Sequence, residues 1–209
     1  MRVVIFGAGG KTGSHLVEQA LERGYEVMAF SYHIVDAFPD SDRLEVFEGD
    51  AMDENAVKLA TTGADAIISA LGHGTDTPAN MQAKSMRNII SACRSHGIKR
   101  LISLTGSGVR DPGDKPGFLD KTLNLAIFIL LRRIIQDGVE HARLIQESDL
   151  DWVIVRATRL TNGPKTGDYS VGLVRKGVRY RVSRADVADF MLNQLEDDTY
   201  LRQMPYISH

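Results

Sequence analysis

The 209-residue chain is 43% hydrophobic, a size and composition that suit one large domain with a substantial core. Its 25 basic and 27 acidic residues give a net charge of -2, which excludes the basic footprint of a nucleic-acid-binding protein. The one cysteine, Cys93, excludes an internal disulfide and reads as a buried, unreactive thiol. No signal peptide fits before the first apolar run, and residues 123–131, the longest apolar stretch, are shorter than the ~20 residues of a membrane span. We expect a cytoplasmic protein with no membrane partner, no nucleic-acid partner and no metal.

The chain opens with a predicted strand, a glycine-rich turn and a predicted helix. Val3–Phe6 is a short apolar run, and Gly7-Ala8-Gly9-Gly10-Lys11-Thr12-Gly13 follows it directly. Helical spacing of apolar residues begins next, so the turn has the context of a dinucleotide fingerprint. Glycine lets backbone N–H groups approach a pyrophosphate, and the helix start adds unpaired donors. The turn therefore predicts a nucleotide site, although a tight strand–helix connection with nothing bound has the same pattern.

Strands and helices alternate along the rest of the chain. The predicted strands are Val3–Phe6, Glu26–Phe30, Leu44–Phe47, Ala66–Ala70, Leu101–Thr105 and Trp152–Arg156. The predicted helices are Thr12–Arg23, Asp53–Thr61, Pro78–His96, Asp120–Glu147 and Ser183–Glu196. Apolar strands that alternate with helices predict an α/β fold of the Rossmann type, a doubly wound parallel sheet of order 3-2-1-4-5-6. Residues 158–182 interrupt the alternation and are expected to form a small substrate-side lobe.

The whole set of motifs resembles the atypical short-chain dehydrogenase/reductases, of the flavin reductase, biliverdin-IXβ-reductase and NmrA-like type. The resemblance covers nearly the whole chain. It rests on the glycine turn together with segments that follow later strands, which are Gly49-Asp50-Ala51, Ser69-Ala70-Leu71-Gly72, Ser103-Leu104-Thr105-Gly106-Ser107, Glu147–Arg156, Thr161–Pro164 and Ser183–Ala188. The resemblance implies an NAD(P)-binding domain with a ligand site at the carboxyl ends of the strands.

The same resemblance implies a role for each matching position. The pyrophosphate turn consists of Gly7, Gly10, Lys11, Thr12 and Gly13. The adenine lies beside Asp50 and Ala51, although an acid such as Asp50 is also a common loop or helix cap. The ribose and the nicotinamide lie along Ala70, Leu71, Gly72, Thr105 and Gly106. His73 comes directly after this loop, where it either reaches the cofactor or substrate or is an exposed loop histidine.

The catalytic residues depart from a pattern that many short-chain enzymes share. None of the six tyrosines is followed by a lysine four residues later, so the usual Tyr-x-x-x-Lys proton donor is absent. The atypical branch also lacks this pair, and its work is then positioning of the reactants. The candidates for a polar catalytic group are Ser107, which is equally a turn former, and His141, for which an ordinary histidine on the helix surface is the slightly favoured interpretation.

The cofactor preference depends on the end of the second predicted strand. That strand ends Phe30-Ser31-Tyr32-His33, with neither the acid that selects NAD nor the arginine that selects NADP, and Asp36 comes too late. Lys11, Ser31 and His33 are able to hydrogen-bond a 2′-phosphate. We therefore expect NADP, with NAD as the alternative.

These features predict an NAD(P)H-dependent oxidoreductase that passes hydride to a flavin, a quinone or a similar conjugated acceptor. An NmrA-like redox sensor, which binds the dinucleotide without turnover and engages a partner, is the alternative. An epimerase or isomerase is less favoured because the tyrosine pair is missing. Residues 123–131 are apolar all round, which predicts a pocket lid, a homodimer contact or a well-buried crossover helix.

Overall fold

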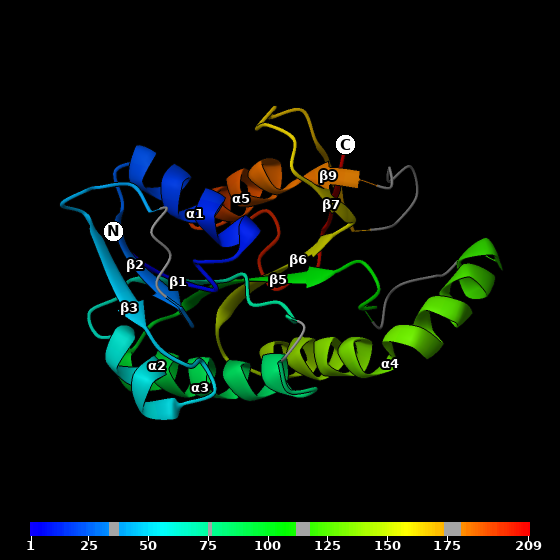
Figure 1. Cartoon of the computed structure of the whole chain (residues 1–209), viewed down its shortest axis with the longest axis horizontal. Helices are drawn as coiled ribbons and strands as arrows, with labels where there is room; N and C mark the ends of the chain where they lie inside the picture. The colour runs from blue at the N-terminus through cyan, green and yellow to red at the C-terminus, as the bar shows by residue number, and fades with distance from the viewer. Residues whose placement is uncertain (34–37, 75–76, 112–117, 174–180) are drawn as a thin grey trace.

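A computed structural model of the chain describes residues 1–33, 38–74, 77–111, 118–173 and 181–209, with the backbone alone over 118–131. An eight-stranded sheet lies between two layers of helices (Figure 1). Its strand order is β3-β2-β1-β4-β5-β6-β10-β8, so the predicted 3-2-1-4-5-6 order is confirmed and two further strands extend it. The strands of this sheet are β1 (Arg2–Phe6), β2 (Glu26–Ser31), β3 (Leu44–Glu48), β4 (Ala66–Ser69), β5 (Arg100–Gly106), β6 (Asp151–Ala157), β8 (Ser170–Gly172) and β10 (Tyr206–Ser208).

Two helices cover one face of the sheet, and three cover the other. The first layer holds α1 (Lys11–Glu22) and α5 (Arg184–Asn193), and the second holds α2 (Glu54–Ala60), α3 (Met81–His96) and α4 (Phe118–Gln146). All six predicted strands and all five predicted helices are present, with bounds that differ by a few residues at most. Most strands are buried, but β3 is largely exposed because it forms the edge of the sheet.

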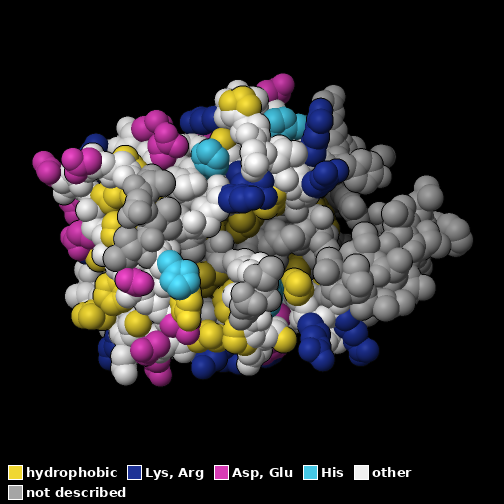
Figure 2. Space-filling model, in the orientation of Figure 1, with side chains coloured by type: hydrophobic (Ala, Val, Ile, Leu, Met, Phe, Trp, Pro, Cys, Tyr) yellow, Lys and Arg dark blue, Asp and Glu magenta, His cyan; other side chains and the backbone are white. Residues whose placement is uncertain are grey.

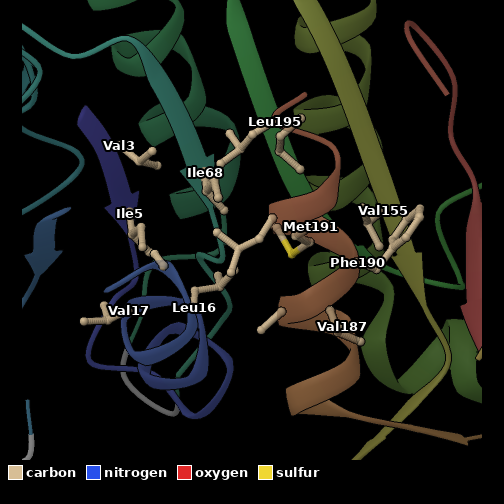
Figure 3. Packing of buried hydrophobic residues seen from close by; sticks show 14 of the residues in the cluster. Val3, Ile5, Leu16, Val17, Ile68, Val155, Val187, Phe190, Met191 and Leu195 are labelled. Carbon is tan, nitrogen blue, oxygen red and sulfur yellow. The ribbon is translucent and has the colours of Figure 1, made fainter. Parts of the chain in front are cut away.

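Apolar side chains fill the space between the sheet and the α1/α5 layer. Figure 3 shows Leu16 of α1 and Met191 of α5 pointing toward one another beside Ile5 and Ile68 of the strands. These four side chains are fully buried. Their burial fixes α1 against β1, which sets the position of the turn between them.

The second layer packs equally tightly but includes more polar side chains near β5. Val4, Ile67 and Leu101 of the strands meet Ile89 of α3 and Ile145 of α4 in a second apolar cluster. Cys93 is fully buried in this cluster, and burial raises the pKa of its thiol to about 12, so the predicted buried, unreactive thiol is confirmed.

Residues 158–182, which the sequence predicts to form a small substrate-side lobe, contribute strands to two different sheets. Within 158–182, β7 (Arg159–Thr161) pairs with β9 (Arg181–Ser183) in a small two-stranded sheet, whereas β8 joins the main sheet antiparallel to β10. The α5 helix then begins as predicted. Ser183 is its N-cap, and the Ser183 hydroxyl accepts a hydrogen bond from the backbone N–H of Asp186.

Candidate functional site

The turn between β1 and α1 has room only for backbone. Gly7 adopts φ +77°, in the left-handed region that favours glycine, and a Cβ there would lie 2.9 Å from the carbonyl oxygen of Ala70. A Cβ on Gly13 would lie 2.0 Å from the carbonyl oxygen of Gly7. The turn is therefore folded tightly on itself and against the loop after β4, which leaves its outer side as a cradle of backbone groups.

The start of α1 faces this cradle without a side chain across it. Gly10 is the N-cap and has no side chain to bond the first amides, and the first turn of the helix carries no acid. Uncapped helix amides and the helix dipole attract an anion, and the exposed Lys11 adds a positive charge beside them. This arrangement fits a pyrophosphate.

The loop after β3 is held in a defined shape. Asp50 accepts a hydrogen bond from the backbone N–H of Met52 (2.8 Å), and the carbonyl of Ala51 accepts one from the Asn88 side chain of α3 (3.0 Å). A Cβ on Gly49 would lie 3.0 Å from the rings of Phe30 and Phe47, so the loop passes close to both aromatic rings. Asp50 has the loop-capping role that the sequence left open, and its second carboxylate oxygen stays available to a ligand.

The end of β2 presents Ser31 and His33, the two residues expected near a 2′-phosphate. Ser31 is buried and donates its hydroxyl proton to the carbonyl of His33 (2.7 Å), while His33 is exposed. The Ser31 proton is thus already used within the strand end. Asp36, the acid that comes too late in the sequence, lies outside the described residues.

The ends of β4 and β5 lie side by side at the centre of the sheet. The backbone N–H of Ala70 bonds the carbonyl of Phe6, and the carbonyl of Leu71 accepts a hydrogen bond from the Gln82 side chain (2.8 Å). Thr105 is buried, whereas Gly72 and Gly106 are exposed. The structure therefore brings the β4 loop next to the pyrophosphate turn, with Thr105 one strand further along.

Ser107 and His141, the two catalytic candidates, lie in different surroundings. Ser107 is in the loop directly after β5, where its backbone N–H bonds the carbonyl of Ala157 (2.9 Å). His141 is only 2% exposed and its Nε2 lies 2.9 Å from the hydroxyl of Ser103, two residues deeper in β5 than Thr105. The interpretation of His141 as a surface histidine is therefore wrong. Burial lowers the pKa of His141 to about 4, so the imidazole is neutral at pH 7.

His73 is likewise not an exposed loop histidine. Its side chain is 7% exposed, and its Nε2 lies 2.9 Å from Oδ2 of Asp137 on α4. Asp137 also accepts hydrogen bonds from the backbone N–H groups of Gln82 (2.8 Å) and Ala83 (3.0 Å) at the start of α3. One carboxylate thus joins the β4 loop, α3 and α4.

A family model described as NAD(P)H-binding matches residues 7–198. The chain belongs to this NAD(P)H-binding family. The match runs from the glycine turn to the end of α5, so it includes every loop described above. The protein is thus an NAD(P)H-binding, reductase-like Rossmann domain, and the tight turn with an uncapped helix start fits its dinucleotide.

Curated relatives of this NAD(P)H-binding chain include reductases and proteins without a known activity. It is 30% identical to an uncharacterized chloroplastic protein of Arabidopsis thaliana over 181 residues, which are 80% of this chain and 62% of that protein. It is 33% identical to the 2-alkyl-3-oxoalkanoate reductase of Stenotrophomonas maltophilia over 109 residues, 49% of this chain and 32% of that protein. The chain thus spans less than two thirds of the length of these relatives.

Solved structures share the fold of the NAD(P)H-binding chain over its whole length. The oxidoreductase ylbE from Lactococcus lactis has a TM-score of 0.84 at 19% identity, covering all of this chain and 91% of that one. A short-chain dehydrogenase/reductase from Veillonella parvula in complex with NADP has a TM-score of 0.81 at 22% identity, covering all of this chain and 94% of that one. At these identities the likeness establishes a common architecture.

Sequence reasoning missed Asp137 of this NAD(P)H-binding domain. An aspartate in a long predicted helix reads as a solvated side chain, and the residue it binds, His73, is far away in sequence. The available signal was the four-residue spacing between Asp137 and His141, which places both side chains on one face of the helix.

The pocket lid or dimer contact expected at residues 123–131 lies outside the described side chains and stays a prediction. Within the part of the chain that the structure describes, none of the helices has the length and apolar character needed to cross a membrane.

Proposed function

We propose that the protein is a reductase that passes hydride from NADPH to a flat, conjugated acceptor such as a flavin or a quinone. When bound, the dihydronicotinamide supplies the hydride. The chain's own residues hold the dinucleotide along the edge of the sheet, from Asp50 through the Gly7–Gly13 turn to Thr105. The observation that carries the proposal is the turn itself, whose close backbone packing leaves uncapped amides for the pyrophosphate.

The polar groups near Thr105 favour an acceptor that is easily reduced. A Cβ on Gly138 of α4 would lie 2.9 Å from Val109 Cγ2 and 3.7 Å from Thr105 Oγ1, so this part of α4 approaches the β5 end too closely for a large catalytic side chain. His141, one turn further along α4, is buried and neutral. Positioning then contributes more than strong acid catalysis, as suits hydride transfer to a flavin or a quinone.

Steady-state oxidation of NADPH, followed at 340 nm with a panel of flavins and quinones, tests this function. Turnover with at least one acceptor supports the reductase. Tight NADPH binding without turnover of any acceptor would contradict it and favour the NmrA-like sensor, to which the scarcity of catalytic acids at this edge also points. In that case a protein partner, rather than a small molecule, would be the next target.

The Gly10→Val variant tests the position of the pyrophosphate. Gly10 has an extended backbone (φ −77°, ψ 162°) that valine tolerates, but its Cβ would lie 3.1 Å from the carbonyl oxygen of Gly7 at the mouth of the cradle. We expect NADPH affinity to fall by about two orders of magnitude, an estimate based on several lost phosphate contacts. Calorimetry on Gly10→Ala and Gly10→Val, with circular dichroism as the check on folding, should show a graded loss. Wild-type affinity in both variants would place the phosphates elsewhere.

The preference for NADP is tested at Lys11. An exposed ammonium at the start of α1 is placed to pair with a 2′-phosphate, whereas the ribose hydroxyls of NAD offer it no charge. We expect NADP to bind more tightly than NAD, and Lys11→Ala to reduce the difference about tenfold, as for one charge-assisted contact. Lys58→Ala, at the end of α2, is the matched control. Tighter binding of NAD to the wild type would refute the preference.

A further inference from the structure

His73 combines a place at the cofactor edge with an oriented imidazole ring. It follows Gly72 directly, and both neighbouring glycines, Gly72 and Gly74, are exposed. The ring is folded inward against Asp137, and its other nitrogen, Nδ1, lies 3.3 Å from the hydroxyl oxygen of Thr77. Thr77 itself is exposed at the same edge. The order Asp137, His73, Thr77 therefore runs from the interior to the surface.

The hydrogen bonds around Thr77 assign the proton between it and His73. The Thr77 hydroxyl donates its single proton to the carbonyl of Gly74 (3.0 Å). With that proton engaged, the Thr77 oxygen is an acceptor toward His73, and we infer that Nδ1 supplies the proton of the 3.3 Å contact. A neutral ring with Nδ1–H would turn an unprotonated Nε2 toward a carboxylate, so the arrangement favours a ring that is protonated on both nitrogens.

Asp137 has the surroundings of an ionised carboxylate. Both of its oxygens accept backbone N–H groups from the first turn of α3, where the helix dipole stabilises negative charge. The N–H direction at Nε2 is not aligned with Oδ2, so the 2.9 Å contact between His73 and Asp137 is an ion pair rather than a straight hydrogen bond.

Two other groups that carry protons, His141 and Cys93, are poorly placed to deliver one. His141 is neutral at pH 7, and its Nε2 faces Ser103 within the core. The Cys93 thiol is buried in the apolar cluster around α3. No tyrosine precedes a lysine by four residues.

We propose that Asp137, His73 and Thr77 form a proton relay that protonates the acceptor after hydride transfer. This inference rests on the reductase function proposed above. Hydride brings two electrons and one proton to a quinone and leaves one of its oxygens as an anion. The Thr77 hydroxyl turns from the Gly74 carbonyl to that oxygen, its O–H bond breaks as the proton passes over, and Thr77 recovers a proton from Nδ1 of His73. The neutral ring keeps Nε2–H beside Asp137, and solvent later returns a proton to Nδ1. Thr77 is the catalytic residue in this scheme, and His73 and Asp137 act as positioning residues.

Single-turnover kinetics with NADPH and 2-methyl-1,4-naphthoquinone test the relay. Thr77→Val removes the hydroxyl with little change of shape, and Thr77→Ser keeps it. We expect Thr77→Val to lower the rate of reduction about tenfold to a hundredfold, within the range of one general acid. It should also abolish the solvent deuterium isotope effect while NADPH affinity stays unchanged. Thr77→Ser should restore both, and Thr62→Val at the end of α2 is the matched control. An unchanged rate and isotope effect in Thr77→Val would overturn the relay.

Nuclear magnetic resonance of the imidazole nitrogens provides a readout that needs no turnover. We expect an Nδ1–H signal from His73, assigned by its loss in His73→Gln and not in His96→Gln. Thr77→Val should shift this signal, and Thr77→Ser should not. In one outcome the wild type reduces no acceptor and still shows an Nδ1–H signal of His73 that shifts in Thr77→Val and not in Thr77→Ser. The reductase function would then be wrong, whereas the hydrogen-bonded chain from Asp137 through His73 to Thr77 would be supported. If Nδ1 carries no proton, the relay is wrong whatever the enzyme reduces.

Discussion

The two faces of the sheet are built from the same strands but hold different side chains. Toward α1 and α5 the strands present an apolar surface, seen close by in Figure 3. Toward α3 and α4 the same strands present polar groups that are buried near their carboxyl ends, which are Ser69, Ser103, Thr105 and Arg156, and the helices add Gln82, Ser85, Asp137 and His141. The α1/α5 layer also buries Gln19, Asp186 and Asp189, but these three belong to its helices and not to the strands. A buried polar group costs free energy unless it is hydrogen-bonded, so this face gives up stability for defined geometry. We infer that the apolar face fixes the fold and that the polar face shapes the proposed site at the strand ends.

The surface at the strand ends is divided in a related way. Figure 2 shows acidic side chains gathered mostly on the left of the molecule, on the side of β2 and β3, and basic side chains toward its centre and right. The basic part lies on the side of β6 and β7. An acceptor that carries negative charge would meet a favourable field there.

The largest effect is expected from a substitution at Gly13, the most tightly packed glycine of the turn beside the apolar face. In Gly13→Ala the new methyl group would lie 2.0 Å from the carbonyl oxygen of Gly7 and 2.7 Å from Cα of Ala8, so the backbone of the turn has to move. We expect a loss of about 3 kcal/mol of unfolding free energy, the upper end for overpacking, together with loss of NADPH binding. Urea unfolding and calorimetry measure both. Gly163→Ala, where the methyl group would meet Ser183 Cβ at 3.6 Å, is the control. Equal stability of the two variants would contradict the comparison.

A pH series sharpens the comparison on the polar face. Because burial lowers the pKa of His141 to about 4, its stabilising effect is present at neutral pH and is lost as pH falls from about 6.5 to 4. This change contributes at most about 3 kcal/mol, from 1.36 kcal/mol for each unit of pKa. His141→Gln should remove this part of the pH dependence in urea unfolding between pH 7 and pH 4.5, whereas His96→Gln should retain it. Parallel curves for wild type and His141→Gln would show that the His141 ring protonates without cost.

Asp186 provides a smaller test beside the apolar face. Burial acts to raise its pKa, but hydrogen bonds from Ser183, Gly167 and Thr166 outweigh it and lower the pKa to about 2. The stabilising effect is therefore complete above pH 4 and is lost as pH falls toward 2. Asp186→Asn should cost about 2 kcal/mol at pH 7, because it replaces a charged acceptor of several hydrogen bonds. The exposed Asp168→Asn serves as the control, and thermal unfolding of both variants measures the difference. A neutral Asp186→Asn would show that the network around it is redundant.

The sequence predicts the apolar face far better than the polar one. Continuous apolar runs and helical spacing are local signals, so β1, α1 and the order of the first six strands follow from them. The short strands β7 to β10 have three residues each, too few for a pattern, and β8 pairs with a strand more than thirty residues away. The His73–Asp137 ion pair joins residues 64 positions apart, and its existence depends on the packing of α4 against α3. A contact of this kind carries no local periodicity, so reasoning from one sequence has little access to it.

The place of β10 determines when this sheet is completed during synthesis. Tyr206–Ser208 lies between β6 and β8, parallel to the first and antiparallel to the second, so β8 has no partner until the ribosome has passed residue 208. Arg156 also contacts this segment. Its guanidinium donates hydrogen bonds to the carbonyl of Met204 (2.7 Å) and to the hydroxyl of Tyr206 (2.9 Å), and it lies 3.6 Å from the centre of the Tyr206 ring. A nascent chain that pauses before residues 204–208 are made exposes the unpaired edge of β6, and Arg156 then lacks the acceptors on Met204 and Tyr206. Unpaired strand edges favour aggregation, so residues 204–208 protect this side of the sheet once they have joined it.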